Sequence, residues 1–207
     1  MGNTERFTKL LGECRRQMNG AIVGSMRYYG TEYGLNYGVS LPTIRSLAKA
    51  EGHDHCYAKY LYQQQVREIR LASLHIASPE LVSSEELDFW AAGIINSEVA
   101  EEASFALFQY VDAVTQWLSS ENELLIYTAL LSISKSKKIE VVAFNNLISK
   151  YLHIDSLLLN NAIIILLESY YRNKANRIAI DKIIADLPTS KSSSYIIEEM
   201  TWRKKCL

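Results

Sequence analysis

The sequence predicts an all-α protein built as a stack of paired helices. Eight of the nine glycines lie in the first 52 residues, and the remaining 155 residues contain one glycine and two prolines. β-Sandwiches and β-barrels need turn residues about every 8–12 positions, so this scarcity excludes them. Helix-start signals recur along the chain, and four alanines recur at the spacing of a helix pair. Together these observations favour helices throughout.

Two adjacent helices are predicted after the glycine-rich start. The first begins at Ser40, or one residue later, and has Pro42 in its first turn, where a missing N–H is tolerated. It ends at Gly52, and Asp54 caps the second helix, which continues to about residue 62.

Two capping boxes predict further helix starts. In a capping box, a Ser and a Glu three residues later satisfy free N–H groups of the first turn. Ser83 with Glu86 precedes one apolar run, and Ser120 with Glu123 precedes another. Amphipathic periodicity predicts the other helices over residues 66–77, 98–110, 138–152, 155–172, 176–186 and 191–203.

Four of these helices carry an alanine in a similar apolar setting. The separations are 31, 26 and 33 residues along the series Ala72, Ala103, Ala129 and Ala162. A helix pair with two short loops occupies about 30–45 residues, so the spacing is that of a helical solenoid. The alternative is an ordinary helical bundle in which the alanines are coincidental.

The composition is that of a globular chain without a membrane span. Of its 207 residues, 48% are hydrophobic and 22% charged, which excludes disorder for most of the chain. The longest apolar runs, such as residues 162–167, fall far short of the about 20 residues that a bilayer requires. Residues 1–20 carry charge throughout and show no secretory signal. We expect no membrane association.

Length and cysteine usage predict the domain organisation and the compartment. A chain of this length forms one large domain or two small ones, and we expect a single repeat domain over residues 1–207. The three cysteines, Cys14, Cys56 and Cys206, are far apart and odd in number. A disulfide framework is therefore not expected, and a reducing, cytoplasmic location is.

Charge falls in three blocks. Residues 1–70 carry +4, residues 71–134 carry −10 without a single Lys or Arg, and residues 135–207 carry +5. Phosphate backbones bind where cations converge and are repelled by carboxylates. The basic ends therefore favour nucleic acid, while the acidic middle favours a basic protein partner.

One stretch of sequence resembles a known family. Residues 26–49, MRYYGTEYGLNYGVSLPTIRSLAK, are followed by the phrases VREIRLASLHIA, ELDFW and EVAEEASFALFQY. With these pieces the sequence resembles the AlkD-like DNA alkylation repair family, HEAT-like repeat proteins that include alkylpurine DNA glycosylases, and it is closest to the short, divergent members. The likeness covers residues 15–135 and continues more weakly towards residue 175. It implies a right-handed superhelical stack of HEAT-like helix pairs whose concave groove holds double-stranded DNA.

The resemblance also implies where a catalytic site would lie. In the glycosylases, a tryptophan and an aspartate four residues later cradle and stabilise the cationic sugar, and here these positions hold Glu98 and Glu102. The i, i+4 spacing places both carboxylates on one helix face. The family's arginine is replaced by Ile126 or Tyr127, and a second tryptophan by Ile165. The resemblance therefore implies the repeat scaffold with a largely degenerate glycosylase site.

The acids of this segment also have a simpler interpretation. Glu98, Glu101 and Glu102 are all within the first turns of a predicted helix. Acids are favoured there by the helix macrodipole, so a solvated helix face is the alternative to a catalytic or cation-binding cluster.

Aromatic and basic residues alternate in the N-terminal quarter of the chain. Arg45 and Lys49, four apart on one predicted helix, are the first candidates for phosphate contacts, followed by Arg27 and Arg70. The alternative is that the tyrosines there are amphipathic core residues of the first repeats. Those tyrosines are Tyr28, Tyr29, Tyr33, Tyr37, Tyr57, Tyr60 and Tyr62.

No metal or cofactor is predicted. Residues 53–56, His-Asp-His-Cys, contain ligand types, but a second cluster at compatible spacing is missing, so a helix cap explains them better. The lysines at 135–138 and the basic run at 203–205 are interpreted as solvated surface.

Three functional hypotheses follow. The first is a DNA-binding member of the alkylation repair family with weak or absent excision. The second is a non-catalytic scaffold for a protein or peptide, with residues 71–134 attracting a basic partner. The third is base excision with Glu102 as the carboxylate.

Overall fold

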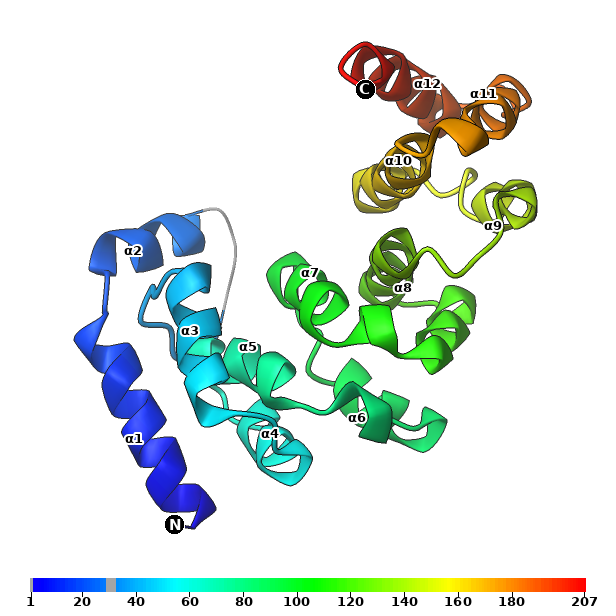
Figure 1. The fold of residues 1–207 in the computed structure, drawn as a ribbon. Helices are drawn as coiled ribbons and strands as arrows, with labels where there is room; N and C mark the ends of the chain where they lie inside the picture. The colour runs from blue at the N-terminus through cyan, green and yellow to red at the C-terminus, as the bar shows by residue number, and fades with distance from the viewer. Residues whose placement is uncertain (1, 29–32) are drawn as a thin grey trace. The chain divides into compact units, whose positions relative to one another are not determined.

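The chain is all-helical in the part that the structure, a computed structural model, describes, namely residues 2–28 and 33–207 (Figure 1). The α-helices are α1 (Asn3–Arg16), α2 (Gly20–Tyr28), α3 (Leu41–Glu51), α4 (His55–Tyr62), α5 (Arg67–Ile76), α6 (Leu87–Ala91), α7 (Ser97–Ala106), α8 (Glu123–Ser136), α9 (Phe144–Ser149), α10 (Leu157–Tyr171), α11 (Arg177–Ala185) and α12 (Lys191–Lys204). The 3₁₀ helices are η1 (Pro79–Leu81), η2 (Ser84–Glu86), η3 (Phe108–Tyr110), η4 (Asp112–Ser119), η5 (Val141–Ala143) and η6 (Lys174–Asn176). Within these ranges no strand forms, and one isolated bridge joins Leu35 to Val66. The predicted fold class is confirmed.

The four spaced alanines lie on four different helices and are all buried. Ala72, Ala103, Ala129 and Ala162 lie on α5, α7, α8 and α10, and each is at most 1% exposed. A side chain no larger than a methyl group allows neighbouring helices to approach closely. The recurring alanine is therefore a packing residue of the repeat.

The helices group into two compact units, residues 1–107 and residues 108–207. In the first unit, α5 is the central helix, and α1, α3, α4 and α7 all pack against it. Ile69, Leu71 and Leu74 of α5 are completely buried in this unit. Because neighbouring helices enclose α5, even its charged residues Arg67 and Glu68 are buried, at 3% and 0% exposure.

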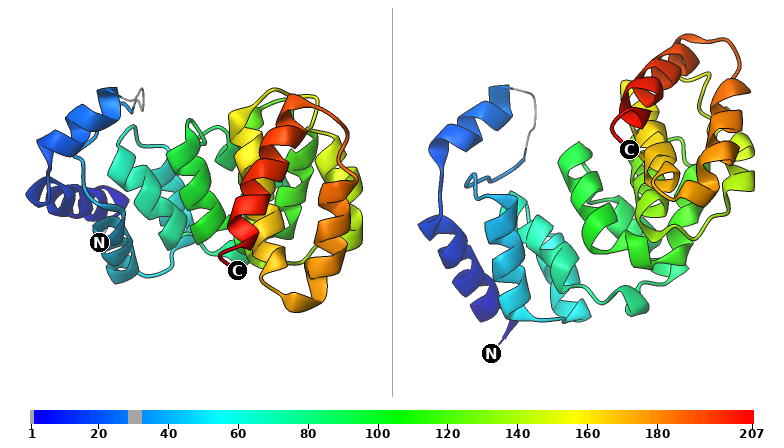
Figure 2. Two further views of the ribbon diagram at one scale, coloured as in Figure 1. Left: turned by 90° about the horizontal axis from the view of Figure 1, so that it is seen from above. Right: turned by 45° about the horizontal axis from the view of Figure 1, so that its top comes forward.

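The second unit repeats the arrangement around α10. Helix α10 packs against α8 and α12, while η4 packs on α8 and α11 on α10. The run Ile163, Ile164, Leu166 and Leu167 is fully buried. Figure 2 gives two further views of the ribbon and shows that helices joined by loops make up each unit.

Two predicted helix caps are confirmed. The hydroxyl of Ser40 accepts a hydrogen bond from the Thr43 N–H at the start of α3, and Pro42 lies in the first turn. The carboxylate of Asp54 accepts the N–H of Tyr57 at the start of α4. These caps satisfy donors that the helix itself leaves free.

Both predicted capping boxes are wrong. Ser83 precedes η2 and makes no side-chain cap, and Glu86 instead binds His55 and Lys59 of α4. Helix α8 is capped by Asn122, and Glu123 accepts a hydrogen bond from the distant Ser156. In each case the acid has a partner in another helix, which a local pattern does not reveal.

Two predicted helix ranges are shorter than expected. The stretch 98–110 ends as an α-helix at Ala106 and continues as η3. The stretch 138–152 contains only η5 and the short helix α9.

Gly93 is required by close packing. A Cβ at this position would lie 2.3 Å from ring atoms of Tyr62, a fully enclosed side chain whose hydroxyl donates to the Trp90 carbonyl oxygen over 2.7 Å.

We expect Gly93→Ala to lower the free energy of unfolding by about 2 kcal/mol, because the ring must move within a packed core. Urea unfolding measures this. Gly12 on α1 has open space around it, so Gly12→Ala is the control and should stabilise by about 0.5 kcal/mol. Equal effects of both changes would contradict the packing explanation.

The three cysteines are free thiols. Cys14 is buried in the first unit, while Cys56 and Cys206 are exposed. Burial raises the pKa of Cys14 to about 12, so it stays protonated at neutral pH.

Candidate functional site

Glu102 is the centre of a charged site in the first unit. This residue of α7 is 3% exposed, and its carboxylate accepts two hydrogen bonds from the Arg45 guanidinium of α3, each 2.8 Å long. The Nε2 atom of His75, at the end of α5, is bonded to the same carboxylate. Three helices therefore meet at one buried acid.

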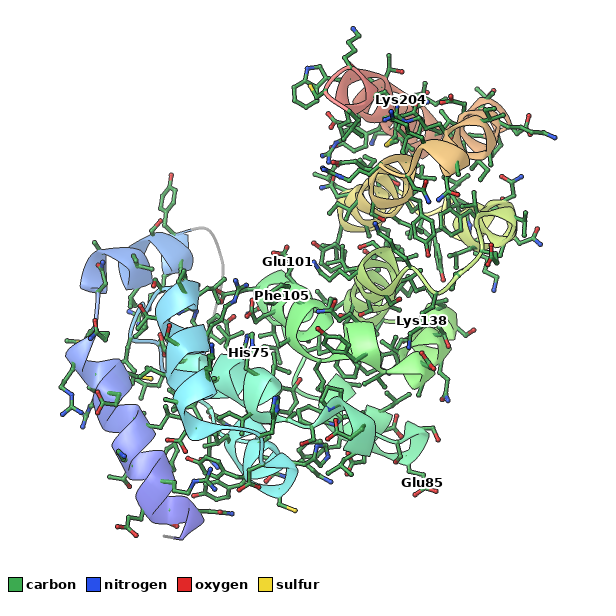
Figure 3. The ribbon with its side chains drawn as sticks, viewed as in Figure 1. His75, Glu85, Glu101, Phe105, Lys138 and Lys204 are labelled. Carbon is green, nitrogen blue, oxygen red and sulfur yellow. The ribbon has the colours of Figure 1, made fainter. Side chains whose placement is uncertain are left out.

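An exposed aromatic ring covers this cluster. The guanidinium carbon of Arg45 lies 4.4 Å from the ring centroid of Phe105, and the His75 ring centroid lies 6.2 Å from it. Phe105 is 41% exposed, and the Arg45 side chain is 39% exposed. Figure 3 shows His75 of α5 beside Phe105 and Glu101 of the neighbouring α7. The site therefore presents a guanidinium and an aromatic face to solvent, with the acid beneath them.

The partners of Glu102 set its charge. Burial by itself would raise the pKa of this carboxyl from 4.5, but the hydrogen bonds from Arg45 and His75 outweigh burial and lower its pKa to about 2. Glu102 is therefore ionised at neutral pH, and its charge is neutralised within the protein.

This lowered pKa predicts a pH dependence of stability. A carboxyl whose folded pKa lies below its unfolded value contributes stability above pH 4.5 and loses it as the pH falls towards 2. Between pH 5 and pH 2 we expect wild type to lose about 2 kcal/mol more than Glu102→Gln, which has no proton to gain. Urea unfolding across this pH range measures the difference. Parallel pH profiles for the two proteins would contradict the ion-pair assignment.

Glu98, one turn earlier on α7, is held in a separate ion pair. Arg67 of α5 donates its Nε to Glu98 over 2.8 Å, and the Tyr33 hydroxyl donates to the same carboxylate. Burial and the bond to Glu98 raise the pKa of Tyr33, so it remains a neutral donor. The i, i+4 spacing does place Glu98 and Glu102 on one face of α7, and each faces an arginine.

Glu68 extends the network into the core. This residue of α5 is completely buried and accepts hydrogen bonds from the backbone N–H groups of Tyr37 and Val39 at 3.1 and 3.2 Å. Arg67 contacts Glu68 over 3.1 Å and also donates to the Val39 carbonyl oxygen. The segment before α3 is thereby fixed to α5 through a buried carboxylate.

The four candidate phosphate-binding residues have different surroundings. Arg27 on α2 and Lys49 on α3 are exposed, and neither is in an ion pair among the residues that the structure describes. Arg45 is exposed at its edge and bound to Glu102. Arg70 donates to the Gly93 carbonyl oxygen over 3.4 Å and its guanidinium lies over the ring of Tyr62.

The predicted tyrosine cluster is divided between core and surface. Tyr37, Tyr57 and Tyr62 are buried, which supports the core interpretation for these three. Tyr28 is 83% exposed. Tyr33 and Tyr60 are half-buried, and Tyr29 lies outside the described residues.

The residue types at 53–56 have structural partners. His53 is hydrogen-bonded to the Ala77 carbonyl oxygen over 3.2 Å, and His55 to Glu86 over 2.9 Å. Asp54 caps α4 and pairs with Arg6. In the ranges that the structure covers, no group of three His, Cys, Asp or Glu side chains is placed to hold a metal ion.

Among the residues that the structure describes, no helix has the length and apolar character needed to cross a bilayer.

The residues that the resemblance aligns with the arginine and the second tryptophan lie in the second unit. Ile126 and Tyr127 are buried on α8, at 3% and 5% exposure, and Ile165 is half-buried on α10.

Three residues of the site were not found from the sequence. His75, Phe105 and Arg67 complete the two ion-pair clusters, and Arg67 binds Glu98 from 31 residues away. The only feature of the sequence that indicates an inward-facing Arg67 is the alternation of charged and apolar residues in VREIRLASLHI. Nothing in the sequence indicates that its partner is Glu98.

No protein-family model matches the sequence. No curated protein matches it either. Among the solved structures that are similar in fold is one described as "a new family of proteins related to the HEAT-like repeat DNA glycosylases with affinity for branched DNA structures". The match covers 95% of this chain and 94% of that chain, with a TM-score of 0.76 and 13% sequence identity. The chain has the HEAT-like repeat fold.

In this HEAT-like repeat chain, the carboxylate of Glu102 is enclosed. It is buried and hydrogen-bonded to Arg45 and His75. The exposed groups of the site, Arg45 and Phe105, are suited to a phosphate and to a flat apolar surface.

Proposed function

We propose that this protein is a DNA-binding HEAT-like repeat protein whose glycosylase site is degenerate. The observation that carries the proposal is the fold likeness, over 95% of the chain, to a protein with affinity for branched DNA. The exposed cations of the first unit support it. The proposal retains the single repeat domain over residues 1–207 and the cytoplasmic location that the sequence predicts.

The proposed phosphate contacts are Arg27, Arg45 and Lys49. Arg45 and Lys49 are one turn apart on α3, and Phe105 lies beside Arg45 as an exposed stacking surface. The guanidinium of Arg70 is directed towards Tyr62 and the Gly93 carbonyl oxygen. In this proposal Arg70 therefore positions those residues and does not contact phosphate.

Salt-dependent binding tests the proposal. Fluorescence anisotropy with a labelled linear duplex and with a four-way junction measures the dissociation constant at increasing salt. Six phosphate contacts predict a slope of log K against log salt of about −5. Arg27→Ala/Lys49→Ala should reduce this slope by about 1.8, whereas Glu85→Gln/Asp88→Asn, which changes exposed acids, should not reduce it. Absence of binding to both DNAs at 50 mM salt would refute the proposal.

The finer part of the proposal is that excision of alkylated bases is weak or absent. It rests on the burial and pairing of Glu102 and on the replacement of the family's Trp and Arg by Glu98 and by core residues. Incubation with methylated duplex should release 3-methyladenine and 7-methylguanine only at the uncatalysed rate, for wild type and Glu102→Gln alike. Release above that rate that is abolished in Glu102→Gln would restore the catalytic hypothesis.

A second candidate function is a protein-binding scaffold. The observation that favours it is the segment 80–88 of the first unit, in which Glu80, Glu85 and Asp88 are exposed and Leu81 is 58% exposed. Figure 3 labels Glu85 in this segment. A labelled lysine-rich peptide should bind wild type and lose affinity when these three acids are replaced by lysine. Equal binding by both proteins would exclude this segment as a partner site.

A further inference from the structure

A second cluster of cations lies in the second unit, where α10 and α12 end. Two ion pairs join α10 and α12. Lys191, the first residue of α12, binds Asp155 just before α10 over 2.7 Å, and in the last turns of the two helices Arg203 binds Glu168. The two helices therefore run in the same direction and their C-terminal ends converge. We call the cations gathered there the C-terminal basic cluster: Arg172, Lys174, Arg177, Arg203, Lys204 and Lys205.

An aromatic ring holds two members of this cluster together. The guanidinium carbon of Arg177 lies 5.1 Å from the ring centroid of Tyr171, and the ammonium of Lys204, labelled in Figure 3, lies 5.2 Å from it. Arg177 also donates to the backbone oxygens of Tyr171 and Leu207, at 3.3 and 3.0 Å. Two positive charges are thus fixed at one tyrosine by oriented contacts.

The carboxylates that form ion pairs with the cluster are too few to neutralise it. Glu168 is shared between Arg172 and Arg203, and Arg203 also contacts Glu199. Lys204 pairs with Asp181. Lys174 and Lys205 are exposed and pair with no carboxylate among the described residues. Six cations therefore face three side-chain carboxylates, which leaves a surplus of three positive charges.

The helix ends account for only part of this surplus. Each helix C-terminus carries about half a negative charge, so α10 and α12 together offset about one of the three. The oxygen of Leu207 that Arg177 binds offsets at most one more. A positive surplus remains, and it lies on the exposed Lys174 and Lys205.

We propose that the C-terminal basic cluster binds the phosphate backbone of DNA, as a contact surface of the second unit separate from the Arg45 site of the first. This inference rests on the proposed function, because it takes DNA to be the polyanion that the cluster binds. Fixed guanidinium and ammonium groups around a tyrosine suit successive phosphates and a sugar or base edge. With one contact surface in each unit, the protein engages DNA at two places.

The test removes the two unpaired lysines. Lys174→Ala/Lys205→Ala in the full chain leaves every ion pair of the cluster intact. With a labelled four-way junction in 0.1 M salt, we expect affinity to fall at least about tenfold and the salt slope to fall by about 1.8.

The control removes two exposed lysines of the second unit that lie outside the cluster: Lys150, which follows α9, and Lys191, the first residue of α12, whose partner Asp155 is also exposed. Lys150→Ala/Lys191→Ala changes the net charge equally, and Lys191 lies 13 residues, about 20 Å, before Lys204 along α12. This variant should change the affinity less than threefold. Circular dichroism and urea unfolding confirm that both variants are folded.

The outcomes separate this inference from the proposed function. If wild type binds the junction and Lys174→Ala/Lys205→Ala binds it with the same affinity, the cluster is not a DNA contact. The same conclusion follows if both variants lose affinity equally. Either result leaves the proposed DNA binding in place. Absence of wild-type binding overturns both. If the variant loses binding only to a labelled polyglutamate peptide, the cluster binds acidic protein segments, and the inference for DNA is wrong.

Discussion

Glu68→Ala should destabilise the first unit by about 4 kcal/mol. The substitution leaves the N–H groups of Tyr37 and Val39 and the guanidinium of Arg67 without their shared acceptor. Glu68 is completely buried, so water does not replace the lost bonds without opening the core. Breaking a buried ion pair typically costs about 3–5 kcal/mol, and each unsatisfied buried donor adds to it.

Urea unfolding followed by circular dichroism measures the change, with Glu85→Ala in the segment 80–88 as the control. We expect Glu68→Gln to be less damaging than Glu68→Ala, because its amide oxygen retains one acceptor. If Glu68→Ala unfolds at the same urea concentration as Glu85→Ala, the buried carboxylate does not hold the segment before α3.

Glu102→Ala should cost about 3 kcal/mol, somewhat less than Glu68→Ala. The change removes the acceptor of Arg45 and His75 and leaves a space beneath Phe105. Part of the loss is recovered because Arg45 is 39% exposed and regains water. The cost should shrink at acidic pH, where Glu102 of the wild type begins to gain a proton.

A double-mutant cycle with Arg45→Ala isolates the pair. We expect a coupling energy between Glu102 and Arg45 of about 2 kcal/mol, as for residues in direct contact. A coupling energy near zero would mean that Arg45 is held by Phe105 alone.

Sequence reasoning predicted the local features of this fold and failed where partners are distant. Ser40 and Asp54 cap helices because each side chain bonds an N–H three residues away, which a pattern records. The supposed capping acids Glu86 and Glu123 are bound to α4 and to Ser156, and no local pattern records those contacts. The spaced alanines are buried because a small side chain within an apolar run suits a helix that packs closely against its neighbours, and a local pattern does record that.

The same holds for the candidate site: sequence spacing predicts which residues share a helix face, but not which distant residues they contact. The spacing of Glu98 and Glu102 predicts that both lie on one face of α7, which they do, but Glu102 is buried, Glu98 is half-buried, and each binds an arginine. The sequence predicts two different roles for Arg45 and Glu102 because 57 residues separate them along the chain. Their pairing turns a proposed catalytic acid and a proposed phosphate contact into one unit, in which Glu102 fixes the direction of Arg45.

The placement of the three thiols makes the chain suitable for two-colour labelling without mutagenesis. Cys56 and Cys206 are exposed, one in each compact unit, while Cys14 is enclosed and protonated. Maleimide dyes should therefore react at two sites only. The efficiency of energy transfer between those dyes then reports the separation of the two units, with and without DNA.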